Sequence, residues 1–362
     1  MASVVGSAGK SFFSRVEGGA TDETDRQELQ EGPIKCRKAI ASLSASYALN
    51  EPNPKLLNYI DGEYKDPSNY EWINVVDPGT GEVSCRVGRG SKTDVDMAVA
   101  SAKAAYPQWS ATPPAVRAGL LCKIADGIRS RLEELARLES CDVGKPLRLA
   151  RAVDIPRAAE NFEFFARMIT VDETAAHAMP DAVNITQRTP VGVAALITPW
   201  NLPLYLLTWK VAPALACGNT VVIKPSELTP LTACALSEIV AAAGVPKGVV
   251  NIVHGYGHEA GAPMVSHPDV RLVSFTGGTA TGRIVASSAA ATFKKTSLEL
   301  GGKNPAVVFA DCDLDKTAEG VARGFCLNSG QVCLCCPRIL VERSIFEVFR
   351  DKLIEIAKRV KV

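Results

Sequence analysis

The feature that most constrains this chain is a regular alternation that starts at Val191. Short apolar runs (VGVAALITP, NTVVIKP, GVVNIVHG, VRLVSFTGG) alternate with segments of helical character (LYLLTWKVAPALAC, LTACALSEIVAAAG, EAGAPMVS, TATGRIVASSAAA). Continuous apolar runs of this length are typical of buried strands, and strands that alternate with helices indicate βαβ units. We therefore expect an α/β fold with a doubly wound parallel sheet.

The segment before this alternation is predicted to be mainly helical. SKTDVDMAVASAKAAYPQW predicts a helix capped by Thr93, and PPAVRAGLLCKIADGIRSRLEELARLES predicts one longer helix. DIPRAAENFEFFARMIT predicts another helix, entered through Pro156. AVNITQR alternates like an exposed strand. Residues 1–50 are interpreted as an N-terminal extension with little core, whose first residues resemble a weak transit peptide but are better explained as a disordered tail.

Composition excludes several classes of function. The 362 residues include 40 basic and 39 acidic side chains, a balance that does not point to nucleic acid or to a membrane surface. The longest apolar runs are shorter than the ~18 residues of a membrane span. Eleven unevenly spaced cysteines argue against a secreted disulfide framework and for a reducing compartment, so a cytoplasmic location is expected, with a mitochondrial one as the alternative.

Polar residues follow the predicted strands, where parallel sheets bind their ligands. Asn201 follows one strand, Lys224 and Glu227 follow the next, and the turn TGGTATG follows another. A lysine and an acid together suit a ribose diol, and the acid would repel a 2′-phosphate, which favours NAD over NADP. An exposed ion pair is the alternative. Glycines that open a helix can bind an anion through backbone amides, although a tight turn explains them equally well.

Two further strand-end residues suggest chemistry. Asn201 could donate its side-chain amide to an oxyanion, or could simply form a turn. Glu299 lies between Leu298 and Leu300 and is expected to be partly buried, which would raise its pKa and suit it to general-base work. A solvated residue on an edge strand is the alternative for Glu299.

The stretch NSGQVCLCCPR places Cys333, Cys335 and Cys336 within four positions. Structural zinc normally needs four ligands in separated pairs, and the four histidines show no paired spacing, so we predict no metal site. A thiol protease would need a histidine base, which nothing nearby supplies. Core packing suits Cys335 and Cys336. Cys333 follows a polar turn, where a thiolate could act as a nucleophile on a carbonyl.

Taken in order, the motifs PWN, WKVAPALACGNTVVIKPSE, FTGGTATG, LELGGKNP and NSGQVC resemble the aldehyde dehydrogenase superfamily from about residue 51 onward. The resemblance implies Cys333 as nucleophile, Glu299 as general base and Asn201 as oxyanion donor. It implies NAD as cofactor and an aldehyde as substrate. The residues that it assigns to the cofactor are Trp200, Lys224, Glu227, Gly257, Gly277, Gly278, Thr279, Ala280, Thr281 and Gly282.

The resemblance also implies a domain division. Residues 51–180 and 191–300 would form the NAD-binding domain, 181–190 an oligomerisation arm, and 301–362 the start of a second, α/β catalytic domain. The resemblance implies that full-length family members are homo-oligomers, and it leaves the oligomeric state of this chain open. The chain ends well before the later family motifs, so we expect a C-terminally truncated form.

DIPRAAENFEFFA, TPWNLPL and NSGQVCLC are similar to the muconic semialdehyde dehydrogenases of aromatic-ring degradation, including tryptophan catabolism. That resemblance implies that Arg157 binds a substrate carboxylate, whereas a surface helix residue is the alternative. Two other functions remain open. One is a catalytically incompetent relative that binds only dinucleotide or partner subunits. The other, a CoA-acylating enzyme, usually lacks the hydrolytic base, and Glu299 argues against it.

Overall fold

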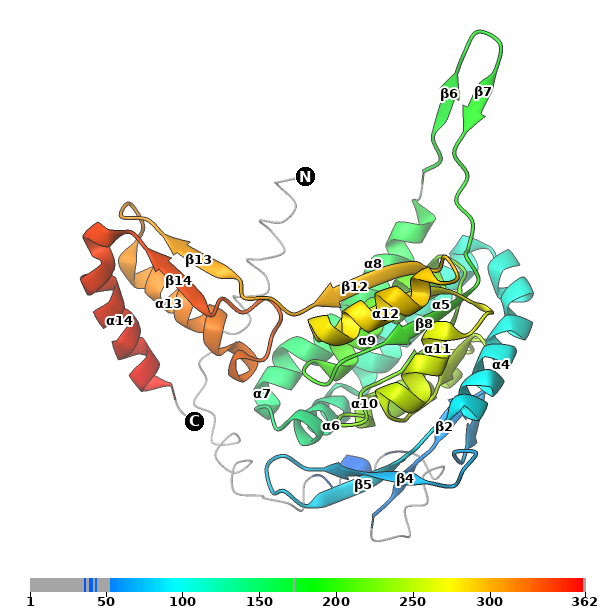
Figure 1. Ribbon diagram of the computed structural model, residues 1–362, viewed down its shortest axis with the longest axis horizontal. Coiled ribbons are helices and arrows are strands. Elements are labelled where there is room, and N and C mark those ends of the chain that lie inside the picture. Colours follow the sequence, from blue (N-terminus) through cyan, green and yellow to red (C-terminus); the bar gives the residue numbers. More distant parts are fainter. Residues whose placement is uncertain (1–35, 37–38, 42, 44–52, 172, 361–362) are drawn as a thin grey trace. The chain divides into compact units, whose positions relative to one another are not determined.

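The computed structural model describes residues 36, 39–41, 43, 53–171 and 173–360, which group into two compact units. Unit 1 runs to Thr276 and includes Ala280–Leu298, and unit 2 contains Gly277–Thr279 and the chain from Glu299 onward (Figure 1). The transit-like start and most of the predicted N-terminal extension lie outside the described residues. Of that extension, Cys36, Ala39, Ile40 and Leu43 are buried, so these positions do contribute to the core.

Unit 1 is built on a seven-stranded sheet in the order β12-β11-β8-β9-β10-β2-β3. The pairs β11–β8, β8–β9 and β9–β10 are parallel, whereas β2 joins β10 and β3 in antiparallel fashion at one edge. The strands are β2 (Asn58–Ile60), β3 (Glu63–Lys65), β8 (Val193–Ile197), β9 (Thr220–Lys224), β10 (Val250–Ile252), β11 (Val270–Gly277) and β12 (Lys295–Leu300). β8 and β9 are buried along their whole length, as their continuous apolar sequences predict.

Helices cover this sheet in two groups (Figure 1). In one, α4 contacts the strands and α11 contacts α4; in the other, α9 and α10 contact the strands, and α5 and α8 pack on α9. Their bounds are α4 (Lys92–Ala111), α5 (Pro114–Ser130), α6 (Leu132–Val143), α7 (Leu147–Leu149), α8 (Ile155–Thr170), α9 (Pro203–Ala216), α10 (Leu231–Ala242), α11 (Ala262–Ser266) and α12 (Thr279–Ala290). Two π-helical turns, Ala150–Asp154 and Gly257–Gly261, lead directly into α8 and α11. The parallel sheet with its covering helices confirms the expected fold class.

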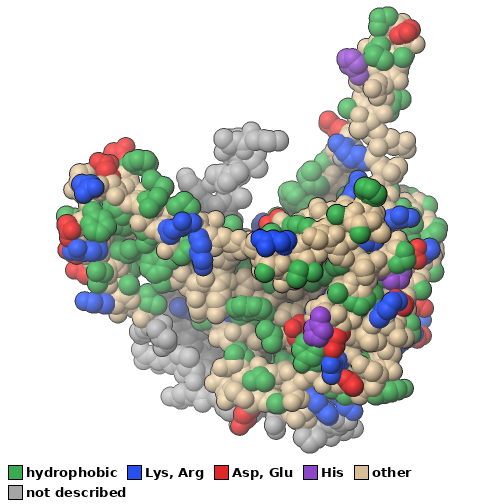
Figure 2. Space-filling view, in the orientation of Figure 1, with side chains coloured by type: hydrophobic (Ala, Val, Ile, Leu, Met, Phe, Trp, Pro, Cys, Tyr) green, Lys and Arg blue, Asp and Glu red, His purple; other side chains and the backbone are tan. Residues whose placement is uncertain are grey.

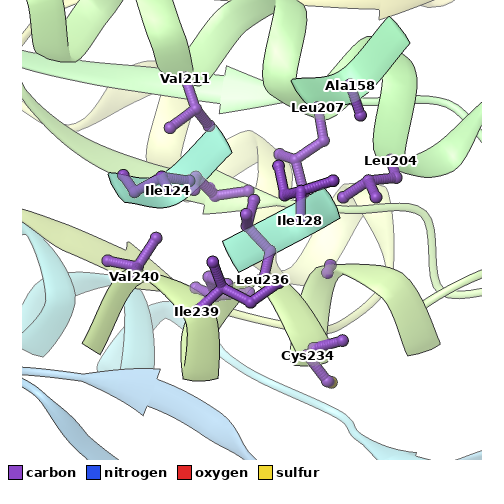
Figure 3. Packing of buried hydrophobic residues seen from close by; sticks show 14 of the residues in the cluster. Ile124, Ile128, Ala158, Leu204, Leu207, Val211, Cys234, Leu236, Ile239 and Val240 are labelled. Carbon is purple, nitrogen blue, oxygen red and sulfur yellow. The ribbon is translucent and has the colours of Figure 1, made fainter. Parts of the chain in front are cut away.

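The core of unit 1 lies largely among four helices. Figure 3 shows apolar side chains of α5, α8, α9 and α10 packed against one another, including Ile128, Ala158, Leu207 and Ile239, all of them buried. At about 25 cal/mol per Å², this burial is the main force that fixes the helices on the sheet. Packing therefore sets the positions of α8 and α9. It thereby also fixes where the polar residues of their first turns lie.

Two details of the predicted helices are wrong. The side chain that caps α4 is Ser91, not Thr93, because Ser91 and Asp94 bond each other's backbone amides in a reciprocal capping box. The predicted long helix is two helices, α5 and α6, because the backbone at Arg131 leaves the helical region with φ −108° and ψ 24°.

The predicted exposed strand is present as β7 (Val183–Ile185), which pairs antiparallel with β6 (Ala176–Ala178), a strand that the sequence analysis missed. Met179, Val183 and Ile185 on this hairpin are exposed. The two strands extend away from the rest of unit 1 (Figure 1). A separate three-stranded sheet contains β1 (Lys55–Leu56), β5 (Val83–Gly88) and β4 (Trp72–Val76), in that order. Cys36 and Cys141 form a disulfide, which the cysteine pattern did not predict.

Unit 2 is a small α/β layer. Its strands β13 (Pro305–Val308) and β14 (Arg338–Val341) are parallel, and its helices α13 (Leu314–Cys326) and α14 (Phe346–Arg359) pack against each other. Its core cluster contains Val308, Ala318 and Phe349. Hydrophobic side chains also lie on its surface (Figure 2). Across the described residues of both units, no helix is long and apolar enough to cross a membrane.

Candidate active site

The strand end after β9 brings Lys224 and Glu227 together. The Lys224 ammonium donates to Glu227 Oε2 at 3.1 Å and to the Pro225 carbonyl at 2.8 Å. Lys224 is almost fully buried, so desolvation lowers its pKa, and the nearby Glu227 carboxylate opposes that shift. Glu227 stays partly open to solvent. A buried ammonium beside an accessible carboxylate is a better diol site than the exposed ion pair that we held as the alternative.

The glycine-rich turn after β11 has the geometry of a strand-to-helix junction. β11 ends at Gly277 and α12 begins at Thr279, with Ala280, Thr281 and Gly282 in its first turn. A Cβ added at Gly278 would meet no atom within 4 Å, so this backbone is open to a ligand. The first-turn amides of a helix lack intrahelical partners and can bind an anion. Gly257, in contrast, starts a π-helical turn, and its surroundings within 4 Å are equally open.

Trp200 and Asn201 lie between β8 and α9. Asn201 is half-buried, and its backbone carbonyl accepts a hydrogen bond of 3.3 Å from the Lys145 ammonium. Trp200 is 40% exposed. Asn201 thus sits where β8 ends, as predicted, and its backbone is held by a side chain that the sequence analysis did not single out.

That side chain belongs to a buried cluster of charges. Lys145 donates to Asp154 Oδ2 at 2.7 Å, and its ammonium lies 3.9 Å from Glu139 Oε1. Burial raises the pKa of Glu139 to about 7, and the positive charge of Lys145 opposes that shift. The only sequence signal for this cluster is the tripeptide GKP, which contains Lys145. A lysine between two turn-forming residues is typical of a surface turn, so the pattern did not indicate a buried charge.

Arg157 lies in the first turn of α8, beside two aromatic rings of α9. Its guanidinium carbon is 6.0 Å from the centre of the Tyr205 ring and 5.8 Å from that of Trp209. It also forms a 3.2 Å ion pair with Glu160, and about a third of the side chain is exposed. Cation–π contacts orient a guanidinium without using all of its N–H groups. These contacts orient the guanidinium of Arg157, and its role toward a substrate carboxylate stays a prediction.

Cys333 lies in unit 2 on a loop held by polar contacts. Asn304 donates its side-chain amide to the Cys333 carbonyl at 2.7 Å and to the Cys335 carbonyl at 3.2 Å. Before the loop, Asn328 and Ser329 adopt positive φ angles of 52° and 58°, which cost energy in non-glycine residues. The thiol is exposed, as predicted. The motif LELGGKNP contains Asn304, but the sequence alone did not reveal its role.

The expectation that Glu299 is partly buried is wrong, because the side chain is exposed. β12 extends through Leu300, so Glu299 lies within the strand rather than after it, and β12 forms the edge of the sheet. An edge strand leaves one side of its residues in solvent. Burial therefore no longer supports the general-base assignment, which stands on the resemblance alone.

Cys335 and Cys336 are half-buried, which is consistent with partial packing. Among the described residues, no group of three or more histidine, cysteine or acidic side chains is arranged to bind a metal ion. The candidate residues fall in both units: Asn201, Arg157, Lys224 and Glu227 in unit 1, and Cys333 with Glu299 in unit 2. The structure describes each unit by itself.

The described residues thus form an α/β protein with a doubly wound sheet, a Lys224–Glu227 pair at a strand end and an exposed loop thiol. The sequence pattern of the aldehyde dehydrogenase family matches residues 64–362. The chain belongs to the aldehyde dehydrogenase family. The recognition made from the motifs is therefore confirmed.

Several relatives refine this placement. The chain is 50% identical over 308 residues to a 2-aminomuconic semialdehyde dehydrogenase of Danio rerio, which covers 84% of this chain and 63% of the relative. It is 47% identical to a 2-hydroxymuconic semialdehyde dehydrogenase of Pseudomonas sp. (strain CF600), and the match covers 83% of this chain and 63% of that relative. The crystal structure of PnpE in complex with nicotinamide adenine dinucleotide matches with a TM-score of 0.82 and 43% identity, covering 84% of this chain and 63% of that one. The chain thus spans less than two thirds of the length of these relatives.

Proposed function

We propose that this chain carries the machinery for NAD-dependent oxidation of an aldehyde to a carboxylic acid, with a muconic semialdehyde as the substrate. The observation that carries the proposal is the exposed Cys333 thiol, on a loop whose carbonyls are held by Asn304. Membership of the aldehyde dehydrogenase family supports the reaction class.

Residues at the ends of β9 and β11 fit the proposed cofactor. Lys224 and Glu227 together can hydrogen-bond a ribose diol, and the open backbone at Gly278 before α12 suits a pyrophosphate. When bound, NAD supplies the acceptor for the hydride. The complex of PnpE with this dinucleotide supports the choice of cofactor.

In the proposed reaction, the Cys333 thiolate adds to the aldehyde carbon and forms a thiohemiacetal. The Asn201 side-chain amide and the Cys333 backbone amide stabilise the oxyanion on the former carbonyl. Loss of hydride leaves a thioester on Cys333. Glu299 then removes a proton from water, which attacks the thioester and releases the acid and the free thiol.

The substrate class is argued from Arg157. Its guanidinium, oriented by Tyr205 and Trp209, can bind a carboxylate in bidentate fashion. A muconic semialdehyde has a carboxylate remote from its aldehyde, so it can use this contact while the aldehyde reacts elsewhere. Relatives whose names specify 2-aminomuconic and 2-hydroxymuconic semialdehydes support this choice. We further propose that the exposed β6–β7 hairpin contacts another subunit, as the family resemblance implies.

The test compares wild type with Arg157→Ala by NADH absorbance, using a muconic semialdehyde and a neutral aldehyde of similar size. Loss of the arginine should raise KM for the acidic substrate by the equivalent of roughly 2–4 kcal/mol. The neutral aldehyde should be almost unaffected. Arg167→Ala, on an exposed part of the same helix, is the matched control. Equal losses on both aldehydes would make Arg157 structural, and no NADH from either aldehyde with wild type would refute the proposed function.

A further inference from the structure

The cluster around Lys145 joins segments that are distant in the sequence. The Lys145 ammonium binds Asp154 at the end of the π-helical turn Ala150–Asp154, and it also binds the backbone carbonyl of Asn201 after β8. The side chains of Lys145 and Asp154 are each 2% exposed. One ammonium group therefore ties the loop of the candidate oxyanion donor to the residue that directly precedes α8.

Glu139 extends the cluster to two more helices. Its Oε2 accepts hydrogen bonds from the Leu204 amide at 3.3 Å and from the Thr232 hydroxyl at 3.1 Å. Leu204 lies in the first turn of α9, where backbone amides have no partner within the helix. Asp142 does the same for α10, because its Oδ2 accepts from the Leu231 amide at 2.7 Å. The two carboxylates of α6 thus replace the side-chain caps that α9 and α10 lack.

The contacts of Lys145 matter because the segments that it joins contain two candidate site residues. Asp154 is three residues before Arg157, the candidate carboxylate ligand, and Asn201 is the candidate oxyanion donor. A π-helical turn inserts an extra residue into a helical ladder, which here turns Asp154 toward Lys145. A buried charge cluster is weak evidence for stability, because desolvation opposes the attraction between its charges. A role in fixing one arrangement explains its presence better.

We propose that Lys145 is a positioning residue, whose buried ammonium group fixes the backbone at Asn201 and the start of α8 in a single arrangement. Its role is to act through Asn201 and Arg157, whose segments it holds. The inference rests on the proposed function for the roles of those two residues. The local anchoring itself can be tested without any activity.

The first experiment measures backbone hydrogen exchange by mass spectrometry in the full chain. In Lys145→Met, exchange should rise about ten-fold or more in the segments 198–207 and 150–160, the scale of one charged hydrogen bond. Segments of β9 and β10 should change little. Lys103→Met is the matched control, because Lys103 forms a 2.7 Å ion pair with Asp269 on the surface. A uniform rise over the sheet, or equal behaviour of the two lysine variants, would overturn the inference.

A second variant separates positioning from stability. Lys145→Met leaves Asp154 buried without its ammonium partner, whereas Lys145→Met with Asp154→Asn removes both charges of that pair. The free energy of unfolding of this double variant should return toward the wild-type value, since neither substituted side chain carries a buried charge that needs a partner. Exchange at 198–207 should stay raised, because the Asn201 carbonyl still lacks its donor. Restored protection there in the double variant would contradict the inference.

Kinetics supply the third readout. In the double variant, kcat/KM should fall by roughly 10²-fold, the effect of misplacing a catalytic group by about 1 Å. Both aldehydes should lose activity, since both need the oxyanion donor, and the acidic one should lose more, since it also uses Arg157. Arg157→Ala should affect only the acidic one. Unchanged kcat/KM for both aldehydes would overturn the inference. If wild type oxidises neither aldehyde, the proposed function fails, and the exchange data still decide the inference.

Discussion

Unit 1 and unit 2 hold their candidate residues by different means. In unit 1 a large apolar core fixes the sheet and helices, and buried charges such as Lys145 secure the ends of those elements. In unit 2 the core cluster contains Val308, Ala318 and Phe349, and the thiol loop depends on polar contacts from Asn304. The candidate cofactor residues Lys224 and Glu227 therefore rest on packing, whereas the candidate nucleophile rests on a few hydrogen bonds. Binding and chemistry should consequently respond to different substitutions.

The largest expected effect separates covalent chemistry in unit 2 from cofactor binding at Lys224 and Glu227 in unit 1. Cys333→Ala should lower aldehyde oxidation by more than about 10³-fold, because the covalent route is lost. NAD affinity, measured by titration, should stay near the wild-type value, since Lys224 and Glu227 are untouched. Cys335→Ala and Cys336→Ala are the controls and should keep most of the activity. Loss of activity in Cys335→Ala with Cys333→Ala still active would reverse the assignment.

The next effect concerns the two cores. Phe349→Ala should destabilise unit 2 by about 3–5 kcal/mol, a large share of what a small core supplies. Hydrogen exchange in α13 and α14 should rise, while NAD affinity is retained. Phe162→Ala, a substitution at a fully buried residue of unit 1, should instead weaken NAD binding. The comparison between the two units fails if Phe349→Ala raises hydrogen exchange in the seven-stranded sheet as much as Phe162→Ala does.

A smaller effect depends on pH. The pKa of Glu139 is about 7 in the folded chain, above its ordinary value of 4.5, so the folded state holds this proton more tightly. Its contribution to stability is complete below pH 4.5 and is lost as the pH rises toward 7, at about 1.4 kcal/mol per pKa unit. Lys145 faces Glu139 with a positive charge, and Asp142 and Asp154 are the nearby acids.

Glu139→Gln should therefore show a shallower fall in Tm between pH 4.5 and pH 7 than wild type. The amide oxygen can still accept hydrogen bonds from Leu204 and Thr232, so α9 should keep its first turn. Thermal unfolding followed by circular dichroism measures the slope. Identical slopes for the variant and wild type would show that Glu139 ionises as freely in the fold as outside it.

The smallest expected effect tests the ribose site. Glu227→Gln should narrow the preference for NAD over NADP by about 1–2 kcal/mol, the scale of one charged hydrogen bond. Loss of the negative charge removes the repulsion of a 2′-phosphate. Glu238→Gln is a suitable control, because Glu238 is a partly buried acid of α10 that pairs with Arg131. A wild-type preference for NADP would contradict the assignment of Glu227.

The sequence predicted well wherever one local pattern decides the structure. β8 and β9 are continuous apolar runs, and they are buried strands; Pro156 marked the start of α8. Prediction failed where a tertiary contact decides. The break at Arg131 interrupts an otherwise regular helical pattern, and the exposure of Glu299 follows from the edge position of β12, which no local spacing encodes.

The candidate site shows the same division. Motifs located Cys333, Lys224 and Glu227, because the residue types themselves suggest the chemistry. The supporting residues Lys145 and Asn304 were missed, since their partners are distant in the sequence: Asn304 binds the carbonyl of a residue 29 positions away, and Lys145 binds one 56 positions away. Their roles follow from the fold and not from their own neighbours.

The central claim is the proposal that the Cys333 thiol and the candidate cofactor residues serve one reaction. Its most direct test incubates Glu299→Gln with aldehyde and NAD and locates the adduct by peptide mass spectrometry. An acyl group should accumulate on Cys333 only when both compounds are present, because hydrolysis is slowed after the thioester has formed. An acyl group on Cys335 or Cys336, or NADH formation by this variant at the wild-type steady rate with no adduct on Cys333, would contradict the account.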